Sequence, residues 1–112
     1  MVTVKVEFQM YEAKLMDDFM GCNWEQDSVA REFVKSYEEV GNKIHVIYWT
    51  APNGGLGSRW VTAEDVAKGW AKAIEAGTHH CGEPIGLDSE DWDACVGTAI
   101  LQFILFGEEV YA

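Results

Sequence analysis

The sequence predicts an α+β fold, in which a small, mainly antiparallel sheet of about three strands, or four, packs against three to four helices. Two stretches carry the apolar pattern of strands, and four carry apolar residues at the three- and four-residue steps of helices. Strands and helices do not alternate regularly, which argues against a series of parallel β-α-β units. The expected order is β-α-α-β-β-α-α, with an optional final strand.

Strands are predicted at 2–8, 43–50 and 59–61. In the first, valine and phenylalanine alternate with polar residues, which is the period of a half-buried strand. The second, KIHVIYWT, is apolar on both faces, so we expect it inside the sheet and covered on both sides. The segment 51–58, APNGGLGS, has the composition of a hairpin turn. Its glycines do not match a phosphate-binding loop, because no lysine follows the last glycine.

Two helices are predicted before the second strand. Apolar residues recur at helical spacing over 11–20, where a hairpin return is the alternative, and Gly21 is the expected stop. They recur again over 29–40, and Gly41 lies where a helix-ending glycine belongs. The charged residues of 29–40 fall on the opposite side of that helix, as in an amphipathic surface helix.

A third helix is predicted to begin after Thr62, which can cap it, and to end at Gly77. Glu64 and Asp65 then lie in the first turn, where the helix dipole favours anions. The next residues, 78–87, have no apolar period and are predicted to form a loop.

The last helix is predicted to be capped by Asp88 or Ser89 and to end at Gly107. It is so apolar near its end that we expect it at the centre of the core or in a dimer contact. Residues 108–112, EEVYA, are the optional edge strand.

The length of 112 residues predicts a single compact domain over 1–112 with its own core. The three cysteines, Cys22, Cys81 and Cys95, form no closely spaced pair, which favours a reducing compartment over a disulfide framework. The first residues do not resemble a signal peptide, and the longest apolar run, 99–106, is too short to span a bilayer. We therefore expect a soluble, cytoplasmic protein, and no motif calls for a cofactor.

The net charge of −11 is unevenly distributed along the chain. Residues 1–72 hold all eight lysines and arginines against eleven acids, whereas residues 73–112 hold eight acids and no base. A one-signed field disfavours nucleic acid and anionic membranes as partners and favours a basic protein surface. The alternative is that the acidity serves solubility alone.

The acids of the C-terminal third form a candidate partner-binding set around the start of the last helix. Acids three apart on a helix lie roughly 5–6 Å from each other, which is close to the spacing of phosphates along a nucleic-acid strand. The alternative is ordinary capping, because acids belong in the first turn of a helix. The set comprises Glu75, Glu83, Asp88, Glu90, Asp91 and Asp93.

His79, His80 and Cys81 are the weak candidates for a metal site or a Cys–His nucleophile pair. Adjacent histidines seldom reach one metal ion, and the chain has no CxxC or HxxxH partner for them. The alternative is a polar loop with a small buried cysteine.

Two of the five tryptophans are candidate interface anchors. Trp24 lies in the polar stretch CNWEQD, and Trp60 directly follows the glycine-rich loop. Tryptophan is enriched at protein interfaces, although partial burial in the core is the alternative for both.

These observations favour a non-enzymatic binding protein that docks its acidic C-terminal third on a basic, nucleic-acid-binding protein and inhibits or modulates it. In size and charge the chain resembles small acidic proteins of phages and mobile elements, which include nucleic-acid mimics, but the resemblance covers no motif. Two other hypotheses stay open. One is a small enzyme or metal protein built on 79–81, and the other is a homo-oligomeric accessory protein that dimerises through the last helix.

Overall fold

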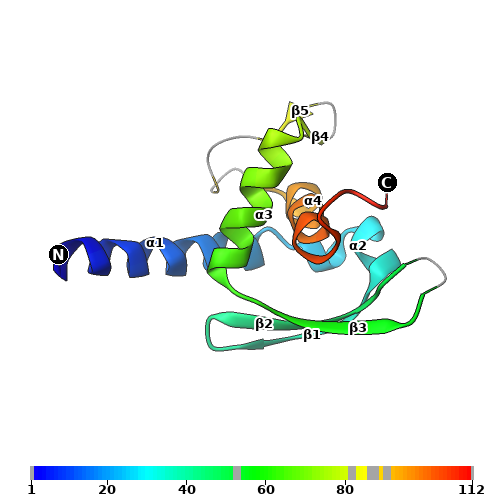
Figure 1. Cartoon of the computed structure of the whole chain (residues 1–112), viewed down its shortest axis with the longest axis horizontal. Coiled ribbons are helices and arrows are strands. Elements are labelled where there is room, and N and C mark those ends of the chain that lie inside the picture. The colour runs from blue at the N-terminus through cyan, green and yellow to red at the C-terminus, as the bar shows by residue number, and fades with distance from the viewer. Residues whose placement is uncertain (1, 52–53, 81–82, 86–88, 90–91, 112) are drawn as a thin grey trace.

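The computed structural model describes residues 2–51, 54–80, 83–85, 89 and 92–111 (Figure 1). It confirms the predicted fold class, because a three-stranded antiparallel sheet in the order β1-β2-β3 is packed against helices. A second, two-stranded sheet joins β4 to β5. The elements are α1 (Val2–Gly21), the 3-10 helix η1 (Trp24–Gln26), α2 (Ser28–Phe33), β1 (Val34–Val40), β2 (Lys43–Trp49), β3 (Leu56–Val61), α3 (Ala63–Glu75), β4 (His79–His80), β5 (Glu83–Pro84) and α4 (Ala94–Phe106).

The three-stranded sheet forms the lower layer in Figure 1, and α1, α3 and α4 lie above it. β2 is the central strand, antiparallel to β1 on one side and to β3 on the other. The strands predicted at 43–50 and 59–61 are therefore confirmed, and Thr50 and Gly55 pair at the hairpin between them. In that hairpin the N–H of Thr50 donates to the carbonyl of Gly55 over 2.9 Å.

The helix predicted over 29–40 is wrong for most of its length. α2 ends at Phe33, and residues 34–40 form the edge strand β1. Gly41 does adopt a left-handed conformation, with φ of 62°, but it serves the two-residue hairpin that pairs Val40 with Lys43. A left-handed glycine suits both a helix end and a tight hairpin, so the same glycine is compatible with either structure.

The strand predicted over 2–8 is also wrong, because these residues form the first two turns of α1. No strand of the described sheets pairs with this segment. An alternating pattern produces a strand only when a neighbouring strand takes up its backbone hydrogen bonds. Within a helix those bonds are made inside the segment itself, and the helix predicted at 11–20 simply extends towards the N-terminus.

The third predicted helix is confirmed as α3, and Thr62 caps it through a reciprocal capping box. The N–H of Asp65 donates to the Thr62 hydroxyl over 3.3 Å, and the N–H of Thr62 donates to the Asp65 carboxylate over 3.0 Å. Arg59 of β3 adds a 3.0 Å ion pair to the same carboxylate. Asp65 thereby joins the start of α3 to the sheet.

Replacing Asp65 with asparagine is expected to lower the free energy of unfolding at neutral pH by about 1–2 kcal/mol. Burial alone would raise the pKa of Asp65, but the hydrogen bonds from Thr62 and the charge of Arg59 lower it below the ordinary value. A carboxylate with a lowered pKa stabilises the fold above its unfolded-state pKa and loses that effect as the pH falls through the folded-state pKa.

Urea unfolding of both proteins at pH 7 and at points below about pH 4 measures this effect, since carboxylates of unfolded chains titrate near 4. The difference between wild type and D65N should shrink as the pH falls. Glu64→Gln is the control, because it removes an exposed carboxylate from the same helical turn together with its 3.1 Å pair to Lys68, and it should cost less than about 1 kcal/mol. A difference that is independent of pH would contradict the assignment.

α4 begins later than predicted. Its N-cap is Asp93, whose carboxylate accepts from the N–H of Val96 over 2.9 Å. Ser89, predicted as a cap, instead donates to Asp18 of α1 over 2.6 Å, while Asp88 lies outside the described residues. Gly107 ends the helix as predicted, with φ of 77°.

α4 is the central helix of the fold, since every residue from 97 to 104 is buried. That burial accounts for its apolar excess without a dimer contact. Residues 108–111 form no strand, contrary to the expectation for this segment. They are held by the buried Gln102, whose amide oxygen accepts from the N–H groups of Val110 and Tyr111, both over 2.8 Å.

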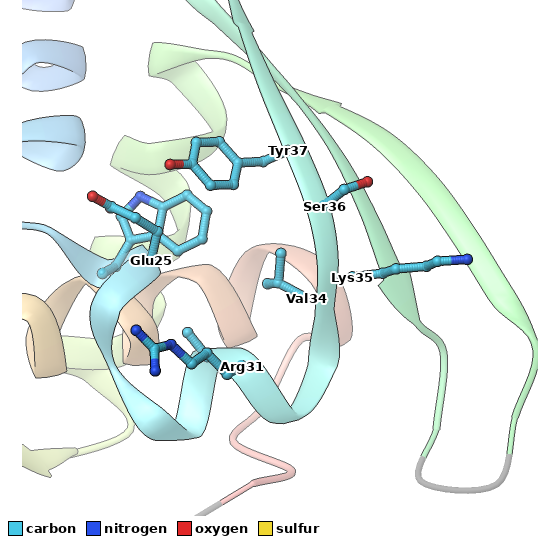
Figure 2. Close-up of a pocket in the computed structure, with 8 residues that line it drawn as sticks. Glu25, Arg31, Val34, Lys35, Ser36 and Tyr37 are labelled. Carbon is cyan, nitrogen blue, oxygen red and sulfur yellow. The ribbon is translucent and has the colours of Figure 1, made fainter.

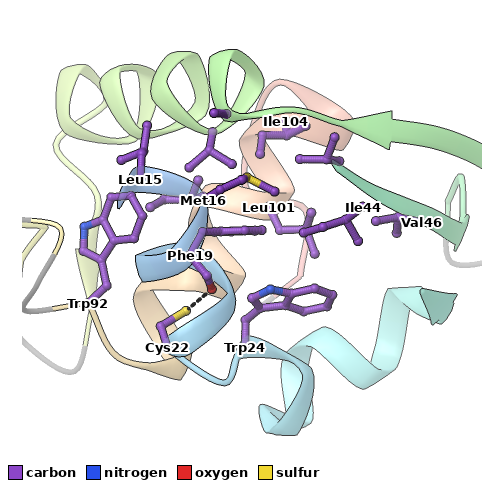
Figure 3. Close-up of a cluster of buried hydrophobic side chains, with 14 of the residues drawn as sticks. Leu15, Met16, Phe19, Cys22, Trp24, Ile44, Val46, Trp92, Leu101 and Ile104 are labelled. Carbon is purple, nitrogen blue, oxygen red and sulfur yellow. Dashed lines mark hydrogen bonds between the residues drawn. The ribbon is translucent and has the colours of Figure 1, made fainter. Parts of the chain in front are cut away.

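The core lies between the sheet and the three long helices (Figure 3). Ile44 and Val46 of β2 face Phe19 of α1 and Leu101 of α4, and all four are buried. The Cys22 thiol donates to the Phe19 carbonyl over 2.9 Å at the end of α1. One continuous apolar cluster therefore connects the sheet to the helices.

No helix in the described part of the chain combines the length and the apolar character needed to cross a membrane.

Candidate functional site

The sheet has one covered face and one open face. Ile44 and Val46 alternate along β2 with His45 and Ile47, so the two pairs project from opposite sides. The first pair is buried beneath the helices. Around the second pair, the strand pairing places the following residues on the open side, here called the outer sheet face: Ser36, Glu38, Val40, Lys43, His45, Ile47, Trp49, Leu56, Ser58 and Trp60.

Trp60 is the largest exposed side chain at one end of the outer sheet face, with 48% of its surface accessible. It lies directly opposite His45 on β2, and the two ring centroids are 4.8 Å apart. The Lys43 ammonium lies 5.8 Å from the Trp60 ring centroid, within the range of a cation–π contact. Trp60 is thus held in place by neighbours on the central strand.

A second apolar pair lies at the other end of β2 and β3. Trp49 and Leu56 are direct cross-strand partners, and both are exposed. Ile47 and Ser58 form the pair between them and the Trp60 end. The outer sheet face therefore presents a continuous band of cross-strand pairs from Trp60 to Leu56.

This face carries little net charge in a strongly acidic chain. Glu38 is its one acid, and it lies opposite His45 on β1. Lys43 is its base, and Figure 2 shows Lys35, beside the β1 bulge, pointing to the same side of the strand as Ser36. The remaining acids among the described residues lie on other parts of the molecule.

The two candidate tryptophans have different environments. Trp60 is exposed on the outer sheet face, where a partner can reach it. Trp24 is 0% exposed and belongs to the core, so an anchoring role for its ring in an interface is withdrawn. It occupies the short η1 between α1 and α2, and Phe19 stacks on it with ring centroids 5.8 Å apart. A polar sequence around a tryptophan therefore does not establish that its side chain is exposed.

The acidic candidates are only partly described. Glu75, the last residue of α3, is exposed, and Asp93 is the exposed N-cap of α4. Glu83 belongs to β5, while Asp88, Glu90 and Asp91 lie outside the described residues. Asp93 therefore has the local capping role that was the alternative to partner binding, and a common surface for the set stays a prediction.

The candidates for a metal site or a nucleophile pair are also only partly described. His79 and His80 form β4, and Cys81 lies outside the described residues. In the ranges that are described, no three His, Cys, Asp or Glu side chains come close enough to hold a metal ion. Of the other cysteines, Cys22 is buried, and this burial raises the pKa of its thiol to about 11, which is far from that of an activated nucleophile.

Trp60 is exposed on this face, but the sequence does not predict the open face around it. The segment 43–50 was expected to be covered on both sides, whereas the helices cover only one side of β2. The open face is indicated by the alternate residues of β2, which are Lys43, His45, Ile47 and Trp49. This mixture of aliphatic, aromatic and charged side chains is typical of a protein interface and not of a hydrophobic core.

Comparison of the chain with protein-family models, with curated proteins and with solved structures found no match.

Proposed function

We propose that this protein is a non-enzymatic binding domain that docks on a basic protein through its outer sheet face. The observation that carries the proposal is the group of four exposed large apolar side chains on that face: Val40, Trp49, Leu56 and Trp60. Single exposed apolar residues are normal on a protein surface, but contiguous ones mark interaction sites.

The charge of the chain indicates the kind of partner. A second copy would bring together two bodies of −11 each, and nucleic acid would be repelled in the same way. A basic protein is attracted at long range and can then bury the nearly neutral outer sheet face. The eight acids after Lys72 strengthen this attraction and contribute a second, electrostatic part of the docking.

The proposal can be tested with two matched substitutions to aspartate. Leu56 lies on the outer sheet face and is 46% exposed, whereas Val110 lies beside α4 and is 42% exposed. Affinity capture from a lysate of the source organism identifies a basic binder, whose affinity is then measured with purified proteins. Leu56→Asp and Trp60→Ala should each weaken binding by about 30-fold or more, as expected for apolar side chains that a partner buries, and Val110→Asp by less than about 2-fold.

The electrostatic part needs its own variant. Replacing Glu75, Glu90 and Asp91 by lysine should slow association at low salt and leave the dissociation rate nearly unchanged. Wild-type association rates in that variant would remove the C-terminal acids from the proposal. Wild-type affinity in Leu56→Asp and Trp60→Ala, with folding intact by circular dichroism, would reject the outer sheet face as the docking site.

A further inference from the structure

The strand β1 leaves one edge of the three-stranded sheet open. The sheet has the order β1-β2-β3, so β1 pairs only with β2 among the described strands. Every residue of β1 after Val34 is exposed. In the described part of the chain, no element other than β2 shares a backbone hydrogen bond with residues 35–40. Such an edge presents a row of unpaired N–H and C=O groups, with which an extended chain can pair.

Tyr37 and Glu39 carry the backbone groups that point away from the sheet. In an antiparallel sheet, successive residues of a strand direct their N–H and C=O groups to alternate sides. The N–H of Thr50, just beyond β2, donates to Gly55, so the even-numbered residues of β2 point to β3 and the odd-numbered ones to β1. These odd-numbered residues pair with the even-numbered residues of β1 from 36 to 40. The odd-numbered residues of β1 therefore point outwards.

A cavity of about 350 Å³ runs along this open edge, between β1 and the short elements η1 and α2. Its lining includes four consecutive residues of β1, from Val34 to Tyr37. Side chains alternate along a strand, and Figure 2 shows Lys35 and Ser36 pointing away from the side on which Tyr37 lies. The cavity therefore meets Lys35 and Ser36 near their backbone, as a groove beside the edge of a strand does.

The groove offers an apolar site for one side chain of an added strand. Ala30 is buried, Val34 is half-buried and Tyr37 is 42% exposed. The Tyr37 ring packs on the buried Trp24, with ring centroids 5.1 Å apart, and this contact holds it beside the groove. An apolar side chain can thus cover the exposed part of the Tyr37 ring without entering the core.

The charges along the edge have opposite signs at its two ends. Glu38 and Glu39, near the hairpin to β2, are exposed on opposite sides of the strand. Arg31 and Lys35 are exposed near its start. A strand antiparallel to β1 begins at the end of the two glutamates. A complementary segment therefore has its basic residues first, then an apolar residue beside Tyr37, and an acid last.

A bulge sets the length of the segment that can be added. The register of β1 against β2 shifts between Val34 and Ser36, and the extra residue of a bulge interrupts regular pairing. An added strand can therefore pair with residues 36–40 only. Charges and a bulge on an edge strand also oppose open-ended association of sheets, so this edge suits one short segment whose charges match.

We propose that β1 and the groove beside it bind an extended segment of the basic partner, which adds to the sheet antiparallel to β1. Two lysines or arginines of the segment lie opposite Glu39 and Glu38, and the apolar residue that follows packs on Tyr37. The backbone bonds provide affinity, while the groove and the acids provide specificity. The inference rests on the proposed function only for the source of the segment. Because β1 borders the outer sheet face, one partner can occupy both.

The test is a titration of the full chain, followed by NMR, with the synthetic peptide acetyl-TKKLTE-amide. Its lysines come opposite Glu39 and Glu38, and its leucine comes opposite Tyr37. It should bind saturably with a Kd below about 1 mM. The reversed peptide acetyl-ETLKKT-amide has the same composition and should bind at least about 10-fold more weakly. The same loss is expected when the leucine is N-methylated, because this removes the N–H that donates to the Tyr37 carbonyl.

Hydrogen exchange and substitutions at Glu39 locate the bound peptide. Saturation should slow exchange of the Tyr37 and Glu39 amide protons by about 10-fold or more. The amide of Glu38 points to β2 and should change by less than about 2-fold. Glu39→Pro removes a charge and an outward N–H, whereas Glu39→Gln removes the charge alone. Both should stay folded by circular dichroism, and the proline should weaken the peptide more than the glutamine does.

No saturable binding of acetyl-TKKLTE-amide to the folded wild type would overturn the proposal, as would equal affinities for the three peptides. Unchanged exchange at Tyr37 and Glu39 in the saturated complex would also overturn it. Leu56→Asp and Trp60→Ala should bind the peptide as the wild type does, even though they are expected to lose the partner. Loss of the peptide in these two variants would place it on the outer sheet face and reject the β1 edge. Failure of the proposed function leaves the peptide result unchanged, so the two failures are distinguishable.

Discussion

Phe19→Ala is expected to lower the free energy of unfolding by about 3–5 kcal/mol, the cost of removing a large aromatic side chain from a core. Phe19 is 0% exposed and stacks on Trp24, which is also fully buried. Its ring lies where α1, α4 and the sheet meet (Figure 3). Alanine leaves a cavity that neighbours on three separate elements would have to close.

Chemical denaturation of both proteins in urea measures this loss. Trp60→Ala is the control, because it removes a larger ring that is 48% exposed on the outer sheet face, and it should cost less than about 1 kcal/mol. A similar cost for the two substitutions would contradict the division between a closed core and an open face. The same pair separates stability from binding, since Trp60→Ala should lose the partner while remaining folded.

Gly97→Ala is expected to destabilise the fold by about 2 kcal/mol, even though alanine is the better helix former. Gly97 lies in the first turns of α4, and an added Cβ would collide with the Cys22 thiol and approach the Cβ of Trp24 to 3.0 Å. The chain after α1 can pass this close to α4 only because residue 97 has no side chain.

The collision predicts coupling between the two positions. In a double-mutant cycle, Gly97→Ala should cost less in a Cys22→Ala background, with an interaction energy of about 1 kcal/mol. Gly21→Ala is the matched control, because an added Cβ there has no atom within 4 Å. It should be neutral or slightly stabilising, and a cost equal to that of Gly97→Ala would reject the steric explanation.

The elements that could be predicted are those whose residue pattern fits only one kind of secondary structure. Thr62 followed by Asp65 is a capping box, and it begins α3 as predicted. The segment from Lys43 to Trp49 is rich in β-branched and aromatic residues, and it forms the central strand. In both cases local chemistry and tertiary packing favour the same structure.

The errors arose where one pattern fits two structures. Val34, Tyr37 and Val40 lie at helical steps of three, yet they belong to the exposed edge strand β1. The alternation in 2–8 suits a strand, but the described sheets offer it no neighbour. Pairing between distant segments decides both cases, and a local pattern does not contain that information.

The candidate site was predictable only in part for a similar reason. Trp60 projects from β3 onto the outer sheet face, and that side of the sheet leaves it exposed, whereas the next residue, Val61, is buried. Trp24 lies in a polar stretch of the sequence, but its side chain packs in the core cluster with residues of α1, α4 and β2. The difference depends on which helices cover which face, a property of the assembled fold and not of the tryptophan's neighbours.

Gln102 fastens the last described residues of the chain to α4. Besides accepting from Val110 and Tyr111, its amide nitrogen donates to the Tyr111 carbonyl over 3.1 Å. Tyr111 in turn stacks on Phe33 of α2, with ring centroids 5.2 Å apart. Breaking the glutamine's contacts would uncover an aromatic side of the core without unfolding the sheet, since these bonds bind only the last described residues to α4. This segment can therefore open locally, at a lower free energy than global unfolding, and its amide protons would exchange with solvent before those of the central strand.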